Sequence, residues 1–282
     1  MSLGDYRYFR IYDPKERLIC AAAFRERVVH HAVMIVCEPF FEKYAIYDTY
    51  ACRPGKGLHR ALLRAREMTR RHPWYLKLDI RKYFDSIRHD ILLAALERLL
   101  RDRDLHRLLI RVMESYNTAP GCGLPIGNLL SQHCANFYLG ILDHWLLEVR
   151  RVPGYLRYMD DFVLFADSHE RLKGELSHIV DFLNHRLGLT PKPPQLNKSA
   201  LGVPMLGFRV FPGRILLAPR SRKRFVRKFS RYEADARSGA LDSRELVRRV
   251  TALVSFTRAA DAVGFRRQII GQRGASEGAP TA

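Results

Sequence analysis

The sequence predicts an α+β fold in which single strands and hairpins lie between helices and form an antiparallel sheet. Apolar residues alternate with polar ones over short stretches, whereas longer stretches repeat apolar residues every three to four positions. The strands do not alternate regularly with helices, as a parallel βαβ array would require. Hydrophobic residues make up 47% of the 282-residue chain, so a large core can be buried.

Each element is predicted from a local pattern. Residues 6–20 carry alternating aromatic side chains and a turn signal at Asp13-Pro14, which predicts a β-hairpin. Helical periodicity predicts helices over residues 24–43, 58–71, 90–101, 104–116, 129–149 and 170–187. Short apolar runs predict strands over residues 76–80, on both sides of Asp160-Asp161, and over residues 205–211 and 214–218. Two basic helices are expected over residues 221–259, with a break at Ser238-Gly239.

A Pro/Gly stretch at residues 211–213 marks the expected domain boundary. We expect one domain over residues 1–211 and a basic helical module over residues 212–273. Residues 274–282 are rich in Gly, Ala and Pro, and we expect a disordered tail there. No apolar run reaches the roughly 20 residues that span a bilayer, and the N-terminus lacks the apolar core of a signal peptide. The sequence therefore predicts a cytoplasmic protein without a membrane partner.

The charge of the chain indicates a polyanionic partner. Its 48 Lys and Arg residues exceed its 29 Asp and Glu residues, which gives a net charge of +19. Between Pro219 and Arg273 there are 15 Lys or Arg and 5 Asp or Glu residues, so more than half of the net charge lies there. Nucleic acid is the expected partner of such a chain. Five cysteines without a C-x-x-C pair predict neither a zinc site nor a disulfide framework.

The start of the basic module has the pattern of a phosphate-binding helix. Cationic residues recur at helical spacing between Phe225, Val226 and Phe229, and residues 220–232 contain no acid. One face of this helix can pack while the other follows a nucleic-acid backbone without reading its sequence. The predicted nucleic-acid-binding residues are Arg220, Arg222, Lys223, Arg224, Arg227 and Lys228.

The stretch RYMDDF places the adjacent carboxylates of Asp160 and Asp161 between two apolar runs. The ordinary alternative is a hairpin turn, because Asp is a common turn residue. Asp79 ends another apolar strand, 81 residues before Asp160. If the two strands are neighbours in one sheet, the three carboxylates meet at one edge, where they would hold two Mg²⁺ ions for phosphoryl transfer.

Several further residues fit a site for a nucleoside triphosphate. Phe84 would lie beneath the sugar and exclude a 2′-hydroxyl, and Arg17 would bind triphosphate oxygens with two hydrogen bonds. Lys198 would donate a proton to the leaving pyrophosphate. The loop GLPIGNLLSQ precedes a helix, and its glycines allow a nucleotide to approach the backbone closely. The loop residues expected to contact the nucleotide are Ile126, Gly127 and Gln132.

Four motifs in order carry a resemblance to a known family. KLDIRKYFDSI, GLPIGNLLSQHCANFYL, RYMDDFVLFAD and PMLGFRV resemble the palm motifs of reverse transcriptases, including the YMDD sequence. RLICAAAFRERVVHHAV and YACRPGKGLHRAL look like finger motifs of the bacterial, group II intron-like branch. The resemblance covers residues 7–211, and more weakly a thumb to about residue 271. It implies a right-hand polymerase fold, with fingers and palm over residues 1–211 and a thumb over residues 212–273.

The same motifs resemble one subgroup most closely. Ile126 stands where many reverse transcriptases have Gln, and Ser131-Gln132 ends the motif in place of Ser-Pro. Both features are similar to diversity-generating retroelement enzymes, and the resemblance implies error-prone copying of an RNA template with a small basic accessory protein. An apolar residue at this position removes a hydrogen bond to the nucleotide or template, which weakens the rejection of mispairs. Splicing is not expected, because maturase and endonuclease regions are not found in the sequence.

The resemblance implies an RNA-directed DNA polymerase that extends a primer with dNTPs on an RNA template and makes cDNA. The primer 3′-hydroxyl would attack the α-phosphate of a dNTP at two Mg²⁺ ions, for which Mn²⁺ can substitute. The residues expected to hold the metals are Asp79, Asp160 and Asp161, with the backbone carbonyl of Ile80. The alternatives are a phage-defence enzyme of the abortive-infection type, another retron or group II-like reverse transcriptase, and a non-catalytic RNA-binding scaffold.

Overall fold

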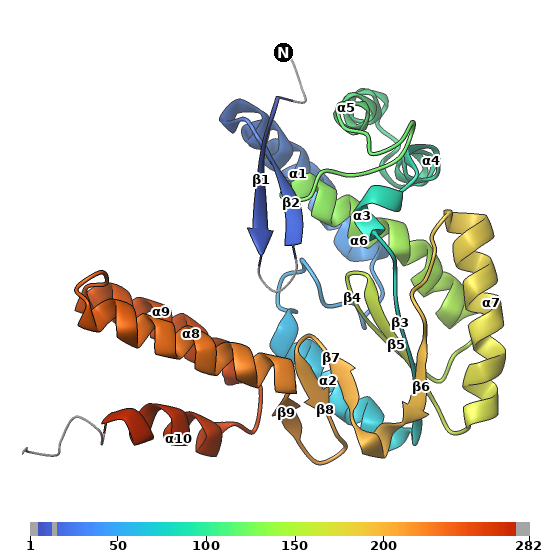
Figure 1. The fold of residues 1–282 in the computed structure, drawn as a ribbon. Helices are drawn as coiled ribbons and strands as arrows, with labels where there is room; N and C mark the ends of the chain where they lie inside the picture. Colours follow the sequence, from blue (N-terminus) through green and yellow to red (C-terminus); the bar gives the residue numbers. More distant parts are fainter. Residues whose placement is uncertain (1–4, 13–15, 275–282) are drawn as a thin grey trace, which may run out of the picture. The chain divides into compact units, whose positions relative to one another are not determined.

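The structure is a computed structural model that describes residues 5–12 and 16–274. The chain forms two compact units, one of Met1–Gly57 and Trp74–Asn197 and the other of Leu58–Pro73 and Lys198–Ala282. Figure 1 shows the elements of both units. The predicted turn at Asp13-Pro14 and residues 275–282 of the predicted tail lie outside the described residues.

The first unit contains a four-stranded sheet with the order β4-β5-β3-β6. Its strands are β3 (Trp74–Asp79), β4 (Gly154–Tyr158), β5 (Asp161–Ala166) and β6 (Gln195–Lys198). β5 pairs antiparallel with both β3 and β4, which confirms the predicted antiparallel sheet. Every residue of β5 after Asp161 is buried, because both faces of this central strand are covered. The edge strand β6 was not predicted, because its residues are mostly polar and exposed.

Helices complete the core of the first unit. They are α1 (Phe24–Tyr44), α3 (Tyr83–Ser86), α4 (His89–Leu100), α5 (Arg103–Glu114), α6 (Leu129–His144) and α7 (His169–Leu187). α7 packs along β3 and β5, and α6 packs against α1 (Figure 1). Apolar side chains of α6 and β5, among them Tyr138, Leu142, Phe162 and Leu164, belong to one buried cluster. The predicted helix over residues 129–149 ends as a π-helical turn, Trp145–Val149.

A two-stranded hairpin precedes α1. β1 (Tyr6–Tyr12) pairs antiparallel with β2 (Glu16–Ala22), as predicted. The aromatic ring of Tyr6 is buried against Tyr116, and its hydroxyl lies 3.1 Å from the Ser115 hydroxyl. The N-terminal end of β1 is therefore fixed to the end of α5.

The second unit combines a small sheet with helices. It contains α2 (Leu58–Arg71), the 3₁₀ turn Ser199–Leu201, β7 (Val203–Met205), β8 (Phe208–Val210), β9 (Ile215–Leu217), α8 (Pro219–Arg237), α9 (Ser243–Thr257) and α10 (Val263–Gly274). β8 pairs antiparallel with β7 and β9. The two basic helices were predicted with their break near Gly239. In the described part of the chain, no helix is both long and apolar enough to cross a bilayer.

One expectation for this region was wrong in detail. The single strand predicted over residues 205–211 is two strands, because Leu206 and Gly207 form a tight turn with φ of 52° and 85°. A Cβ atom at residue 207 would lie 2.8 Å from the Ser221 hydroxyl, so glycine is required there. β7, β8 and β9 belong to the same compact unit as the basic helices. The domain boundary near residue 211 stays a prediction. The division into fingers, palm and thumb stays a prediction.

Candidate active site

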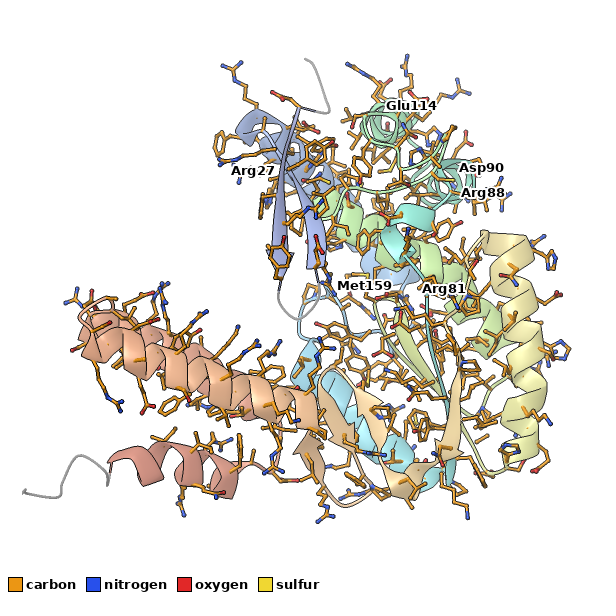
Figure 2. The ribbon with its side chains drawn as sticks, in the orientation of Figure 1. Arg27, Arg81, Arg88, Asp90, Glu114 and Met159 are labelled. Atoms are coloured by element: carbon orange, nitrogen blue, oxygen red, sulfur yellow. The ribbon has the colours of Figure 1, made fainter. Side chains whose placement is uncertain are left out.

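The register of β3 and β5 brings the predicted carboxylates together. Asp79, the last residue of β3, lies directly opposite Asp161, the first residue of β5. Asp160 precedes Asp161 in the turn that joins β4 to β5. Met159 begins this turn (Figure 2) with a left-handed φ of 58°, so the chain reverses sharply here. The three carboxylates therefore lie together where the two central strands, β3 and β5, meet the turn, at the edge of the sheet that the sequence predicted.

The carboxylates of Asp79, Asp160 and Asp161 lie close together, and this changes the pKa of two of them. Burial and the nearby charge of Asp79 raise the pKa of Asp160 to about 6. Burial also raises the pKa of Asp161, against the opposing effect of the Lys77 ammonium, which forms an ion pair with it. Lys192 forms a second ion pair, with 2.7 Å between its Nζ and Asp79 Oδ1. Three acids and two lysines therefore gather here, and two of the acids are ion-paired with a lysine.

The donor set fits a hard divalent cation. Mg²⁺ is held in proteins by carboxylate and carbonyl oxygens. Asp79, Asp160 and Asp161 supply the carboxylates, and the backbone of Ile80 supplies a carbonyl. Burial and, after it, the nearby charge of Asp79 raise the pKa of Asp160, and a bound cation would oppose both effects. Within residues 5–12 and 16–274, no three His, Cys, Asp or Glu side chains are already arranged as a metal cluster. Instead, lysine ammonium groups contact two of the three carboxylates.

Lys192 is a site residue that the sequence analysis missed. The segment around it pairs with the end of β3, because the Lys192 amide donates to the Asp79 carbonyl at 2.7 Å and Ile80 bridges Pro191. The only sequence signal was the Pro-rich stretch PKPP, which was interpreted as a break. Lys198, the predicted proton donor, is the exposed last residue of β6 and is grouped with the second unit.

A buried arginine is bonded to the turn that carries Asp160. Arg157 and Asp143 form an ion pair in which both side chains are almost completely buried. The Arg157 guanidinium also donates to the Asn136 side chain at 2.8 Å, the Asn136 carbonyl at 3.0 Å and the Met159 carbonyl at 3.0 Å. The Tyr155 hydroxyl donates to the same carboxylate at 2.7 Å. This network connects α6 to the turn that carries Asp160, and no sequence pattern predicted it.

The predicted nucleotide-contacting segments meet beside the hairpin. The Cys20 amide of β2 donates to the Ile126 carbonyl at 2.7 Å, and the Leu124 amide donates to the Phe84 carbonyl at 2.8 Å. Gly127 has a φ of 118°, and a Cβ atom there would lie 2.8 Å from a methyl carbon of Ile19. The GLPIG loop is therefore held between the hairpin and α3.

The side chains of these segments differ in exposure. Ile126 and Phe84 are half-buried, and Phe84 packs against Tyr83 with ring centroids 5.8 Å apart. Gln132 is also half-buried, and its side-chain oxygen accepts a bond of 3.4 Å from the Cys52 thiol. Arg17 is exposed on β2, opposite Ile11. The structure thus brings the loop, Phe84 and the strand of Arg17 together, whereas their roles toward a nucleotide remain predictions.

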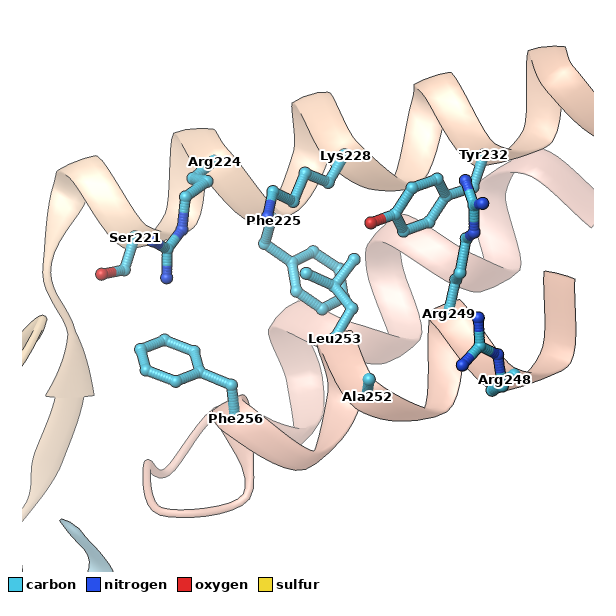
Figure 3. A pocket seen from close by; sticks show the side chains of 10 residues that line it. All are labelled: Ser221, Arg224, Phe225, Lys228, Tyr232, Arg248, Arg249, Ala252, Leu253 and Phe256. Carbon is cyan, nitrogen blue, oxygen red and sulfur yellow. The ribbon is translucent and has the colours of Figure 1, made fainter. Parts of the chain in front are cut away.

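The predicted phosphate-binding residues of the second unit lie on different faces of α8. Arg220, Arg222, Lys223 and Arg227 are exposed, whereas Arg224 and Lys228 line a pocket of about 360 Å³ between α8 and α9 (Figure 3). Arg248 and Arg249 of α9, which were not predicted, line the same pocket. Its apolar wall includes Phe256, which lies 5.4 Å beneath the Arg224 guanidinium. Cations and aromatic rings therefore stand side by side in this pocket.

Comparisons with known proteins show the family of the chain. Residues 13–210 match the family described as "Reverse transcriptase (RNA-dependent DNA polymerase)". The group II intron-encoded protein LtrA of Lactococcus lactis subsp. cremoris is 25% identical over 201 residues, 62% of this chain and 33% of the relative. Protein YkfC of Escherichia coli is 27% identical over 154 residues, 49% of this chain and 40% of the relative. The chain thus spans less than half the length of these relatives.

A solved structure shows the same fold class. Apo telomerase from Candida tropicalis aligns with a TM-score of 0.60 and 11% identity over 97% of this chain and 59% of the telomerase chain. At this identity the likeness concerns the fold alone. The predicted right-hand polymerase fold of mixed helices and sheets is confirmed.

Proposed function

The chain belongs to the reverse transcriptase family, and on this premise we propose that it is an RNA-directed DNA polymerase with Asp79, Asp160 and Asp161 as its catalytic carboxylates. The observation that carries the proposal is the β3–β5 register, which sets Asp79 opposite Asp161. The substrates are dNTPs, a primer strand and an RNA template.

The three carboxylates and the Ile80 carbonyl would hold two Mg²⁺ ions, or Mn²⁺ in their place. Such ions, when bound, lower the pKa of a primer 3′-hydroxyl and stabilise the negative charge of a triphosphate. The protein's own groups fix the carboxylates: Lys77 contacts Asp161, and Lys192 contacts Asp79. Arg17 binds triphosphate oxygens. Phe84 lies beneath the sugar and excludes a 2′-hydroxyl.

The proton for the leaving pyrophosphate has two candidate donors. Lys198 is the residue that the sequence favours, whereas Lys192 has its Nζ 2.7 Å from Asp79 Oδ1. Comparison of Lys192→Gln with Lys198→Gln in single-nucleotide incorporation separates them. The variant that lacks the true proton donor should incorporate a nucleotide at least about 100-fold more slowly, as expected when a general acid is removed.

A primer-extension assay with Mg²⁺ tests the proposed chemistry. Asp160→Asn is expected to abolish incorporation, because one metal ligand is lost, and to leave the binding of an RNA–DNA hybrid unchanged. Arg103→Gln, on the exposed end of α5, is the matched surface control and should keep wild-type activity. Incorporation by Asp160→Asn at the wild-type rate would refute the proposed catalytic role.

Within the family, we propose the error-prone enzyme of a diversity-generating retroelement. The support is Ile126, a half-buried apolar residue whose carbonyl is fixed by the Cys20 amide. With isoleucine at this position, no side-chain amide can form a hydrogen bond to the nucleotide or template, so mispairs are rejected less strongly. A small accessory protein is proposed with this subgroup.

The error spectrum tests the subgroup. Ile126→Gln restores an amide and is expected to lower misincorporation, measured by sequencing cDNA made by both enzymes. Equal error spectra would leave a faithful group II-like, retron or phage-defence enzyme as the better assignment. The match to group II intron proteins is the observation that keeps this second candidate in view.

A further inference from the structure

Helix α1 is apolar on both of its faces. One face is buried, with Val33, Met34, Cys37 and Phe41 in the main core beside α6. A helix that is hydrophobic all round is normally buried on all sides. In α1, however, large apolar side chains also face solvent, and their exposed fractions reach 72% at Phe24 and 76% at Ile35. The outer face is therefore an exception that needs an explanation.

The exposed apolar residues form one continuous line. We call them the α1 stripe: Phe24, Val28, Ala32, Ile35, Val36 and Phe40. Apart from the adjacent pair Ile35-Val36, neighbours in this set are three or four residues apart, which keeps them on one side of the helix. The line is about 24 Å long at 1.5 Å per residue. Nothing in the described residues covers this face, since all six are exposed. Exposed apolar surface in a continuous patch marks an interaction site.

The edges of the stripe are cationic. Arg25, Arg27 and Lys43 are exposed on α1, and the Arg27 guanidinium lies 5.8 Å from the Phe24 ring (Arg27 is labelled in Figure 2). None of the three acids of the helix is fully exposed: Glu26 is buried, Glu38 is half-buried, and Glu42 forms an ion pair with Arg53. A partner at this face is therefore expected to carry negative charge beside its apolar contacts.

The charge also argues against a second copy of the chain. Two stripes packed together would place cationic edges near each other, on molecules that each carry a net charge of +19. Like charges brought together at an interface cost several kcal/mol. A basic protein would be repelled in the same way.

We propose that the α1 stripe is the docking surface for an acidic amphipathic helix of another protein, with apolar residues every three to four positions and Asp or Glu on both sides. Such a helix would extend the α1–α6 packing outward by one layer, in the way that helices bind apolar grooves. The proposal goes beyond polymerase activity, because none of the stripe residues belongs to the proposed catalytic or nucleotide-binding groups.

The test uses the full chain and a synthetic probe. A fluorescent 21-residue helical peptide carries Leu at stripe spacing and Glu at the flanking positions, and its binding is measured by anisotropy at physiological ionic strength. The double variant Phe24→Ser/Ile35→Ser is expected to bind at least about tenfold more weakly, since apolar anchors carry most interface energy. Leu201→Ser, which replaces a 52% exposed apolar residue elsewhere, should bind as the wild type does.

The controls decide between the occupants. A scrambled peptide of the same composition should bind at least tenfold more weakly, and a peptide with Lys for Glu should not bind measurably. Equal binding of the scrambled peptide would overturn the proposal, because net charge alone would then explain it. It would also be overturned if the double variant abolished a dimer of the protein alone, or its binding to anionic phosphatidylserine vesicles. Unchanged primer extension by the double variant would show that polymerase activity does not depend on this face.

Discussion

The Arg157–Asp143 pair gives the sharpest prediction about how the turn that carries Asp160 is held. Arg157→Met keeps most of the side-chain volume but leaves a carboxylate with 1% exposure without its cation. Breaking one partner of a buried pair costs about 3–5 kcal/mol. The hydrogen bonds from the guanidinium to Asn136 and to the Met159 carbonyl are lost with it. Against a typical total of about 5–15 kcal/mol, this loss would remove a large part of the folding stability.

Urea unfolding followed by circular dichroism measures this loss, and a second variant separates charge from packing. In Asp143→Asn/Arg157→Met no buried charge remains, so most of the lost stability should return. Arg157→Lys keeps the charge but cannot reach Asp143, Asn136 and Met159 together, because an ammonium lacks the planar fork of donors. We therefore expect a folded Arg157→Lys enzyme with slow nucleotide incorporation. A loss below about 1 kcal/mol in Arg157→Met, or no recovery in the double variant, would refute the reasoning.

Three further predictions concern the loop, a buried histidine and the basic pocket. Gly127→Ala should destabilise the chain by about 1–3 kcal/mol, because its positive φ and the nearby hairpin exclude a Cβ, whereas Gly174→Ala, in open space, should not. Burial lowers the pKa of His30, so the unfolded state takes up its proton first. As pH drops below about 6.5, the urea midpoint of the wild type should therefore fall relative to that of His30→Phe, and an unchanged difference between the two would contradict this. Arg224→Gln/Lys228→Gln should reduce the slope of log affinity against log salt for an RNA–DNA hybrid by about 1.4–1.8, and an unchanged slope would show that neither residue contacts phosphate.

The sequence predicted the carboxylate edge because strand periodicity and Asp placement are local features. Asp79 ends an apolar strand, and Asp160-Asp161 lies between two others, so only their pairing had to be assumed. The helices of both units followed from periodicity for the same reason. The YMDD stretch was informative only in combination with the other motifs.

The supporting contacts could not be predicted from the same patterns. Lys192 reaches Asp79 across 113 residues, and Arg157 reaches Asp143 on a different element. Neither pair follows from a sequence period, because each depends on how two different elements pack against each other. The strand break at Leu206 was missed because a leucine with positive φ is rare.

The two lysines at the sheet edge explain how three acids can be assembled there by folding alone. Lys77 and Lys192 each contact one carboxylate, so two of the three negative charges are compensated within the protein. The remaining repulsion falls on Asp160, whose pKa burial and Asp79 raise to about 6. Lysine is suited to this position because its flexible stem can exchange a carboxylate oxygen for a phosphate oxygen, and both are anionic acceptors. The two lysines would therefore hold the carboxylates in place before a nucleotide binds. Once it binds, their ammonium groups would be available to the triphosphate oxygens.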